Sequence, residues 1–370
     1  MEHNDVKVGL SVSMSGKYRL QGQQALNGVS LWQSHTTTQG GIPVGSVTRP
    51  VRLVWYDDAS RSGRARENVR RLLQEDRVDI LLGPYSSNLT LAAAEIAEEQ
   101  KKLLWNYGGT SDEIFSRGWK YVVGISTPAS DYFRDLPGWL ARQNPELRRI
   151  CVLYSGKGTF GGQVSRGIIE SAQEASYSVH SVPLNDPSSN PDLVLSTLRE
   201  LNPEVLVLAG NFQDELAILQ TRSRWPNTVR IIAAVSGGMA AFGSQLGQAS
   251  EDVIGASQWE PGLSVSPTVG PSSEWFVDAF QKEFGPTPGY VSAGAYASVL
   301  IAAECVRHMG SIDNDALRSA ASQMNCNTFY GRFQIDQRTG KQLGHRVCLV
   351  RWRALQRLCW LPEFLLCSVV

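Results

Sequence analysis

The sequence predicts an α/β protein of two similar lobes, each built on a doubly wound parallel sheet. Short apolar strands alternate with helical patterns, which is typical of a parallel sheet covered on both faces. The same alternation starts again at Arg149, so it describes two sheets rather than one. With 370 residues, the chain is also too long for one simple core and suits two domains of ordinary size.

The elements of each lobe follow from the spacing of apolar residues. In the first lobe, strands are expected at Val6–Val12, Val51–Tyr56, Asp79–Leu82 and Leu103–Asn106, with helices near Gly22–His35, Gly63–Glu75 and Ser87–Glu99. In the second lobe, strands are expected at Arg149–Tyr154, Val179–Val182, Val205–Leu208 and Ile231–Ala234, with helices near Gly161–Ala175, Asp192–Leu201, Gln213–Arg224 and Met239–Leu246.

The chain beyond residue 250 departs from this alternation. Two helices are predicted at Ser273–Phe284 and Tyr290–Met309, followed by a hairpin of strands Tyr330–Ile335 and Arg346–Trp352. Because these elements come late, we expect the chain to cross back between the lobes and to form a hinge of several strands. The expected division is 1–127 with 258–330 for the first lobe, 128–257 with 331–363 for the second, and an apolar tail at 364–370.

Composition excludes several classes of partner. Lysine plus arginine equal aspartate plus glutamate, 35 against 35, so the net charge does not favour nucleic acid or an anionic membrane surface. No stretch reaches the roughly 20 apolar residues of a membrane span, so we expect no membrane insertion. The N-terminus has no apolar signal core, which is also what a removed signal peptide would leave.

The cysteines and histidines do not form metal or cofactor motifs. The six cysteines are widely spaced and make no C-x-x-C pair, so we interpret them mainly as buried or incidental thiols. The five histidines are scattered, without H-x-x-x-H spacing. We therefore expect neither a metal site nor a cofactor.

Two consecutive strands of the first lobe end in small-residue loops that open into helices. Strand Asp79–Leu82 is followed by Gly83 and Pro84, and Ser87 occupies the expected N-cap position of the next helix. Leu103–Asn106 repeats this design, with a Gly-Gly-Thr-Ser loop after it. Unpaired amides at a helix N-terminus favour an anion, so these loops predict a site for a carboxylate or a similar polar head.

Five stretches together resemble the type I periplasmic solute-binding proteins of the branched-chain amino acid and amide class, which are Leu/Ile/Val-binding protein-like. These stretches are VKVGLSVSMSGKYRLQGQQALNGVSL, VRLVWYDDAS, GPYSS, YGGTSDEIF and YGRFQIDQRTGKQLGHRVCLVRW. Their order and spacing match the family from Val6 to about Glu363. The resemblance implies a Venus-flytrap fold, with a ligand held between two lobes that close on it.

The resemblance also implies which residues bind the ligand. Its carboxylate or amide head is expected at Ser87 and Thr110. The full expected set is Ser87, Thr110, Tyr85, Ser86, Gly108, Gly109, Tyr107 and Tyr18 in the first lobe, and Phe160, Asn211, Phe212 and Ser236 in the second. The three tyrosines can equally be ordinary half-buried aromatics of loops.

One departure from the family bears on the ligand. Amino acid binders of this class usually present a second-lobe carboxylate to the ligand's ammonium, but the sequence after Ile231–Ala234 reads VSGGM and contains no acid. Asp131, Asp214 or Glu260 could reach the site instead. Alternatively, the ligand carries no ammonium and is an amide, a urea-like compound or an aromatic acid.

Other motifs have weaker functional readings. Residues 156–161 form a literal G-x-G-x-x-G, but the next strand does not end in the acid that a dinucleotide-binding fold needs, and Phe160 places a bulky ring in the loop. Asp57 and Asp58 are adjacent in a strand and face opposite sides, so we interpret them as caps of the strand end. Asn88 fits a glycosylation acceptor, yet at a helix start in the site we expect it to stay unmodified.

The resemblance implies a function without catalysis. We expect the solute-binding component of an ABC importer, which acts in the periplasm, binds a small amino acid or amide-type ligand and contacts the transporter's membrane subunits. The alternatives are an aromatic carboxylate as ligand, a ligand-sensing domain of a receptor or a cytosolic regulator, and, remotely, an NAD-dependent Rossmann enzyme.

Overall fold

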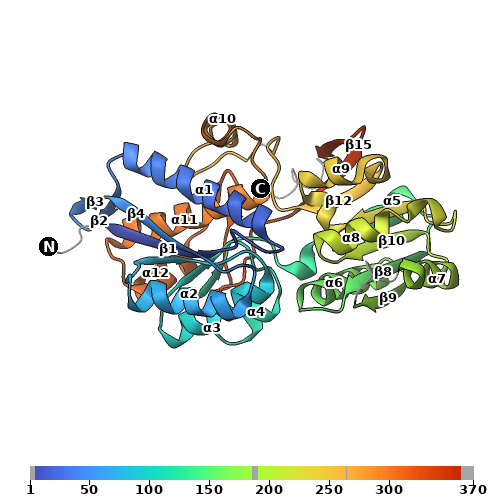
Figure 1. The fold of residues 1–370 in the computed structure, drawn as a ribbon, viewed down its shortest axis with the longest axis horizontal. Coiled ribbons are helices and arrows are strands. Elements are labelled where there is room, and N and C mark those ends of the chain that lie inside the picture. The colour runs from blue at the N-terminus through green and yellow to red at the C-terminus, as the bar shows by residue number, and fades with distance from the viewer. Residues whose placement is uncertain (1–4, 186–190, 264, 360–370) are drawn as a thin grey trace. The chain divides into compact units, whose positions relative to one another are not determined.

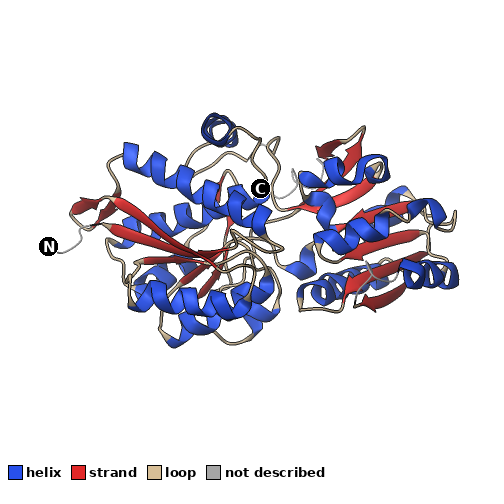
Figure 2. Cartoon of the chain, viewed as in Figure 1, coloured by secondary structure: helices blue, strands red, loops and turns tan. Residues whose placement is uncertain are grey.

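The computed structural model describes residues 5–185, 191–263 and 265–359, which form two compact units of helices and mainly parallel strands (Figures 1 and 2). Unit 1 takes the chain up to Thr127 and Pro261–Arg346, and unit 2 takes Pro128–Glu260 and the chain from Val347. The chain therefore passes between the units three times. The predicted α/β fold with two parallel sheets is confirmed.

Unit 1 is built on a parallel sheet with the strand order β4-β1-β5-β6-β7. These strands are β1 (Val6–Val12), β4 (Val51–Asp57), β5 (Ile80–Leu82), β6 (Leu104–Asn106) and β7 (Val122–Gly124). The helices are α1 (Arg19–Thr38), α2 (Ser62–Gln74), α3 (Ser87–Glu99), α4 (Glu113–Ser116), α10 (Ser273–Phe284), α11 (Tyr290–Met309) and α12 (Asn314–Gln323). Two small hairpins pair β2 (Ile42–Val44) with β3 (Val47–Arg49), and β13 (Cys326–Thr328) with β14 (Gly331–Phe333).

Helices cover both faces of this sheet, as its burial pattern requires. Six of the seven residues of β1 are buried, so this strand is covered on both sides. Helices α2 and α3 pack on one face and α1 and α11 on the other (Figure 1). A Cβ on Gly28 of α1 would lie 2.2 Å from the Ser292 carbonyl oxygen of α11, so glycine is required there for the two helices to approach.

Unit 2 has a sheet with the order β16-β15-β12-β11-β10-β8-β9, in which β15 and β16 are antiparallel to their neighbours. Its strands are β8 (Arg149–Ser155), β9 (Ser178–Leu184), β10 (Val205–Ala209), β11 (Ile231–Ala234), β12 (Val253–Ser257), β15 (Cys348–Arg353) and β16 (Gln356–Cys359). Its helices are α5 (Leu136–Gln143), α6 (Phe160–Glu174), α7 (Pro191–Leu201), α8 (Phe212–Leu219) and α9 (Ala241–Leu246). Two apolar clusters, one on each face of the sheet, form its core.

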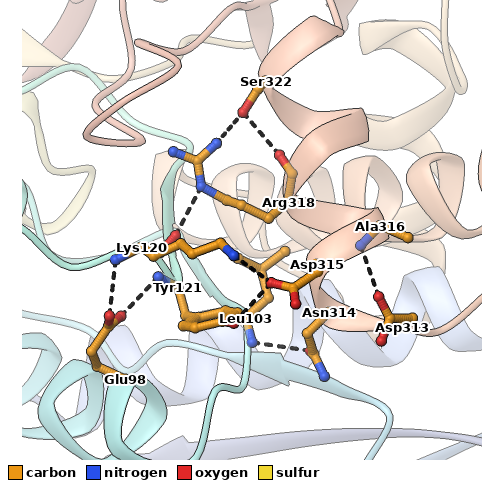
Figure 3. Close-up of polar contacts among 10 residues, drawn as sticks. All are labelled: Glu98, Leu103, Lys120, Tyr121, Asp313, Asn314, Asp315, Ala316, Arg318 and Ser322. Carbon is orange, nitrogen blue, oxygen red and sulfur yellow. Dashed lines mark hydrogen bonds and ion pairs between the residues drawn. The ribbon is translucent and has the colours of Figure 1, made fainter.

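Helix α12 contacts the residues at the amino ends of β6 and β7 through hydrogen bonds between groups 211 and 198 residues apart in the sequence (Figure 3). Asn314 accepts a hydrogen bond from the Leu103 amide at 3.0 Å. Arg318, which is only 5% exposed, donates to the Lys120 carbonyl at 2.9 Å and the Gln337 carbonyl at 3.0 Å. These contacts lie at the end of the sheet opposite to the loops that follow β5 and β6.

Several boundaries agree with the sequence prediction and one late element does not. Strands β1 and β11 and helices α3, α10 and α11 begin and end where they were predicted. The predicted final hairpin is wrong, because β14 pairs with β13 in unit 1 whereas β15 pairs with β12 and β16 in unit 2. Each of these strands pairs only with strands of its own unit.

The division of the chain also differs from the expected one at residues 258–260, which belong to unit 2, and at residues 331–346, which belong to unit 1. The physical reason is hydrogen bonding. The Gln342 side-chain amide donates to the Ile125 carbonyl at 3.0 Å, and His345 Nδ1 lies 2.6 Å from the Thr127 hydroxyl. The expected tail at 364–370 lies outside the described residues. None of the described helices combines the length and apolar character that crossing a membrane requires.

Candidate functional site

The loops after β5 and β6 lie side by side at the carboxyl edge of the unit 1 sheet. Tyr85 and Gly108 form a parallel bridge, and the Ser86 amide donates to the Gly108 carbonyl at 3.2 Å. The two loops predicted to form one site are therefore joined by backbone contacts. The reason is that the carboxyl ends of neighbouring parallel strands meet at the same edge.

Ser86, rather than Ser87, is the N-cap of α3, which corrects the sequence prediction. Its side chain accepts from the Leu89 amide at a long 3.5 Å. Its φ of 85° is positive, a region that non-glycine residues adopt only at a cost of about 1–3 kcal/mol. Such strain persists where the surrounding structure enforces it, and here the pairing of Ser86 with Gly108 does so.

Ser87 is the first residue of α3, and its hydroxyl holds the second loop. Its Oγ accepts from the Thr110 amide at 3.3 Å and from the Ser111 amide at 3.0 Å. Ser87 and Thr110 are each 6% exposed. Since Ser87 Oγ accepts two hydrogen bonds from the protein, its own proton is the part of the hydroxyl that can serve a ligand.

The backbone amides of Gly108 and Gly109, which the sequence analysis placed beside the ligand, are already used within the loop. Both donate to Asn106 Oδ1, at 3.2 and 2.8 Å. Asn106 Nδ2 in turn donates to the Gly109 carbonyl at 2.6 Å. Asn106 was missed as a functional residue, although a buried asparagine ending an apolar strand was a usable signal.

A small set of donors remains at the start of α3. Within the described chain, the amides of Ser87 and Asn88 and the Thr110 hydroxyl have no hydrogen-bonding partner. Together with the Ser87 proton they form a cluster of donors at the positive end of a 13-residue helix. Such a cluster suits an anionic or strongly accepting group, with no formal cation needed.

The three predicted tyrosines differ in their surroundings. The Tyr85 hydroxyl lies 3.0 Å from that of Tyr290, and the Tyr85 ring meets Tyr18 edge to face at 5.6 Å. Both Tyr18 and Tyr85 are half-buried. Tyr107 is only 4% exposed, and burial, with smaller contributions from Asp58 and Tyr85, raises the pKa of its phenol. Tyr107 therefore remains neutral.

Asp57 and Asp58 hold the loop after β1, as expected of residues that cap a strand end. Asp57 accepts from the Met14 amide at 2.9 Å and from the Ser15 hydroxyl at 2.7 Å. Asp58 is fully buried and accepts from the Ser13 hydroxyl at 2.5 Å. The prediction that this pair is structural is confirmed.

In unit 2, Phe160 begins α6, and its ring meets Tyr132 edge to face at 5.3 Å. Phe160 is also part of the G-x-G-x-x-G motif at residues 156–161, and the last glycine of this motif has a packing role. A Cβ on Gly161 would lie 2.5 Å from the Ala209 carbonyl oxygen, so glycine allows α6 to approach the end of β10. The last glycine of the motif is thus explained without a dinucleotide.

Asn211, Phe212 and Ser236 lie at the carboxyl ends of β10 and β11. Asn211 caps α8, because its Oδ1 accepts from the Asp214 amide at 3.1 Å, and the Phe212 ring packs against the core. The Ser236 amide donates to Glu215 at 2.7 Å, and the Ser236 hydroxyl donates to the same carboxylate oxygen. The Ser236 side chain is therefore already engaged within unit 2.

Glu215 holds the loops of unit 2 together, a role that sequence reasoning missed. It is 1% exposed and also accepts from the Gly210 amide at 2.7 Å, so it joins the loops after β10 and β11. Burial raises its pKa to about 7, against the effect of the hydrogen bonds from Ser236 and Gly210. The available signal was a glutamate at the spacing of Phe212, Leu216 and Leu219, which is the apolar face of α8.

The acids proposed as replacements for a second-lobe carboxylate also have partners. Glu260 forms a buried ion pair with Arg357 at 2.9 Å. Asp214 accepts from the Asn211 side-chain amide. Asp131 also interacts with other parts of the chain. In the described part of the chain, no group of three or more His, Cys, Asp and Glu residues is placed to hold a metal ion.

The described cysteines are unpaired thiols, as interpreted from their spacing, and Cys151, Cys305 and Cys348 are buried. Burial raises the pKa of the Cys151 thiol to about 12 and that of Cys326 to about 11. Neither thiol is a reactive nucleophile near neutral pH.

Comparisons with known proteins agree with this architecture. A family model described as periplasmic binding protein matches residues 5–356. The Leu/Ile/Val-binding protein homolog 7 of Brucella abortus (strain 2308) is 26% identical over 341 residues, which cover 87% of this chain and 82% of the relative. Homolog 8 of Brucella suis biovar 1 (strain 1330) is 24% identical over 325 residues, covering 81% of this chain and 77% of the relative.

Solved structures share the fold over nearly the whole chain. The leucine binding protein LivK of Thermotoga maritima MSB8 has a TM-score of 0.84 at 19% identity, covering 96% of this chain and 98% of its own. A solute binding protein of an ABC transporter from Rhodopseudomonas palustris BisB5, solved with 3,4-dihydroxybenzoic acid, has a TM-score of 0.77 at 20% identity, covering 94% and 93%. These relatives are solute-binding proteins rather than enzymes.

Proposed function

Because this chain belongs to the periplasmic binding protein family, as a type I protein of the branched-chain amino acid class, we propose that it is the solute-binding component of an ABC importer. In this proposal it acts in the periplasm and delivers its solute to the membrane subunits of the transporter. Its relatives are solute-binding proteins, which bind small molecules and perform no catalysis.

The observation that carries the proposal is the set of unused donors at the start of α3. The amides of Ser87 and Asn88 and the hydroxyls of Ser87 and Thr110 come from two loops that the chain has joined. A carboxylate or amide oxygen of the solute would accept from them. Thr110 is only 6% exposed, and its hydroxyl has no hydrogen-bonding partner in the described chain, so this hydroxyl is available to a ligand.

In the proposed mechanism, solute bound at these donors is also contacted by unit 2, through residues at the carboxyl ends of its strands. The candidates are Phe160, Asn211 and Phe212, with Ser236 held in place by Glu215. Contacts to both units would stabilise a closed form, which the membrane subunits recognise. Tyr18 and Tyr85, which pack on each other beside the donors, would line the apolar part of the site.

The ligand in this proposal is a small amino acid, an amide or an aromatic acid. Structural neighbours support the amino acid and the aromatic acid. One structural neighbour, from Streptococcus pneumoniae, was solved with isoleucine, and two from Rhodopseudomonas palustris were solved with 3,4-dihydroxybenzoic acid and with benzoate.

A thermal-shift screen tests the proposal directly. A ligand that binds only the folded protein stabilises it by mass action and so raises its melting temperature. At a ligand concentration 100 times its Kd, the free energy of unfolding increases by about 2.7 kcal/mol. We expect at least one compound among amino acids, amides, ureas and aromatic acids to do so, with a Kd confirmed by calorimetry. If every one of these classes failed with folded protein, the proposed function would be rejected.

A further inference from the structure

We propose that Tyr330 and His345 are positioning residues, which connect the loop after β6, residues 107–111, to two of the three chain passages between the units. Buried side chains of unit 1 form a continuous run of hydrogen bonds from Tyr107, the first residue of this loop, to Thr127, the last residue before the first passage. The inference rests on the proposed function, because it gives the site at this loop a physical connection to the hinge.

Ser126 connects the loop to Tyr330. The Ser126 hydroxyl donates to the Tyr107 carbonyl at 2.9 Å, and its oxygen lies 2.9 Å from the Tyr330 hydroxyl. A serine hydroxyl has one proton, and here that proton goes to the carbonyl, so the Tyr330 hydroxyl is the donor to Ser126. Both side chains are buried, which places these two hydrogen bonds away from bulk water.

His345 continues the run from Tyr330 to Thr127. Its ring stacks on the Tyr330 ring, with 4.5 Å between the centroids, and its Nε2 lies 3.1 Å from the Tyr330 carbonyl oxygen. A carbonyl can only accept, so Nε2 carries a proton, and in the neutral ring Nδ1 then accepts from the Thr127 hydroxyl at 2.6 Å. His345 and Thr127 are both buried.

The run ends at two places where the chain leaves unit 1. Thr127 is the last residue before the first passage, and His345 stands next to Arg346, the last residue before the third. The two segments are also bonded to each other, since the Gln342 side-chain amide donates to the Ile125 carbonyl at 3.0 Å. Hydrogen-bonded and packed side chains of this kind carry coupling between distant groups, so a shift of the loop after β6 is passed to both segments.

Two glycines make room for the stacked rings. A Cβ on Gly331, whose φ is +144°, would lie 2.7 Å from His345 Cδ2. A Cβ on Gly294 of α11 would lie 3.1 Å from the Tyr330 hydroxyl oxygen. The backbone therefore approaches the two rings closely and, together with the hydrogen bonds, holds them in one place.

Hydrogen exchange of the ligand-free full chain, followed by mass spectrometry, tests this connection. Tyr330→Phe removes the hydroxyl that donates to Ser126 and keeps a ring to stack on His345. We expect the amides of residues 107–111 and of residues 125–127 to exchange about threefold faster or more, because segments that share one network open together. Thr127→Val breaks the run at its other end, and we expect the same two segments to respond.

Tyr296→Phe is the matched control. Tyr296 lies on α11 in the same unit, is fully buried, and its hydroxyl lies 2.8 Å from His35 Nδ1, outside the run. We expect this variant to leave the exchange of residues 107–111 and 125–127 unchanged. Exchange of residues 107–111 that stays at the wild-type rate in both Tyr330→Phe and Thr127→Val would overturn the inference. An equal increase in Tyr296→Phe would also overturn it, since a general loss of stability would then explain the effect.

The outcomes separate this inference from the proposed function, because the exchange measurement needs no ligand. A connection that fails this test leaves solute binding at the loop after β6 untouched. A ligand screen without a single binder rejects the proposed function and does not alter the exchange result.

Discussion

Ser87 has two roles, one in holding the second loop and one in the proposed ligand site. The sequence suggested only the role in the ligand site. Its oxygen accepts the Thr110 and Ser111 amides, which fixes the second loop, and its proton is left for a solute. Thr110 carries a hydroxyl without a partner among the described residues. The two residues should therefore respond differently to mutation, although both belong to the proposed site.

Thr110→Val should weaken ligand binding by roughly 1–3 kcal/mol with little change in stability, because it removes an unused hydroxyl and keeps the side-chain volume. Ser87→Ala should weaken binding by a similar amount and also lower the free energy of unfolding by about 1–3 kcal/mol, because two buried amides lose their acceptor. Calorimetry and urea denaturation measure the two effects. Thr37→Val, at an exposed site of α1, is the control. Unchanged affinity in both site variants would contradict the assignment.

Glu215 makes the stability of unit 2 depend on pH. Burial raises its pKa to about 7 in the folded protein from the usual 4.5. The folded state therefore holds a proton that the unfolded state releases, and stability is highest below pH 4.5 and falls as the pH rises through 7. The total loss should be roughly 3 kcal/mol.

Denaturation of the wild type and of Glu215→Gln between pH 4 and pH 8 checks this expectation. The variant should lack most of the decline, since glutamine does not titrate. Glu99→Gln, at the exposed end of α3, should keep the wild-type profile. A Glu215→Gln profile as steep as that of the wild type would show that another group carries the pH dependence.

At the scale of elements, α12 shows how polar contacts fix a helix that was not predicted from the sequence. Asn314 accepts from the Leu103 amide, and Arg318 donates to the Lys120 carbonyl (Figure 3). Arg318 also donates to the Gln337 carbonyl. Burial lowers the pKa of Arg318, but it stays charged at neutral pH. The helix thereby supports the amino ends of β6 and β7. The carboxyl end of β6 leads to the proposed site, and that of β7 leads to Pro128, where the chain first passes into unit 2.

Arg318→Ala should cost roughly 2–4 kcal/mol of unfolding free energy, because two carbonyls lose a charged donor in a nearly buried setting. The control is Arg307→Ala on α11, whose side chain is 57% exposed and pairs with Glu304 on the surface. That change should cost about 0.5 kcal/mol or less. Chemical denaturation compares the two variants, and equal losses would mean that the α12 contacts contribute little.

For the whole molecule, the proposal predicts that ligand binding changes shape as well as stability. A solute contacted by both units favours the closed form, so the radius of gyration in small-angle X-ray scattering should decrease at saturating ligand. Thr110→Val should require proportionally more ligand for the same decrease. A ligand that raises the melting temperature without changing the radius of gyration would contradict closure while leaving binding established.

The sequence alone predicted the elements whose patterns are local. Helix α3 has an apolar face at helical spacing, and β1 has an apolar residue at every second position of VKVGLSV, so each could be placed without knowledge of its neighbours. The loops after β5 and β6 could be brought together for the same reason, since parallel strands end at one edge. The resemblance to a known family then identified Ser87 and Thr110 as the pair to examine.

Only the tertiary structure decided how the polar groups are shared. Strands β14 and β15 follow each other in the chain, but β14 pairs with β13 and β15 pairs with β12, so the predicted hairpin was wrong. The amides of Gly108 and Gly109 and the hydroxyl of Ser236 became engaged because Asn106 and Glu215 are buried against them. Hydrogen-bond saturation depends on which groups meet in three dimensions, and no local pattern of residues contains that information.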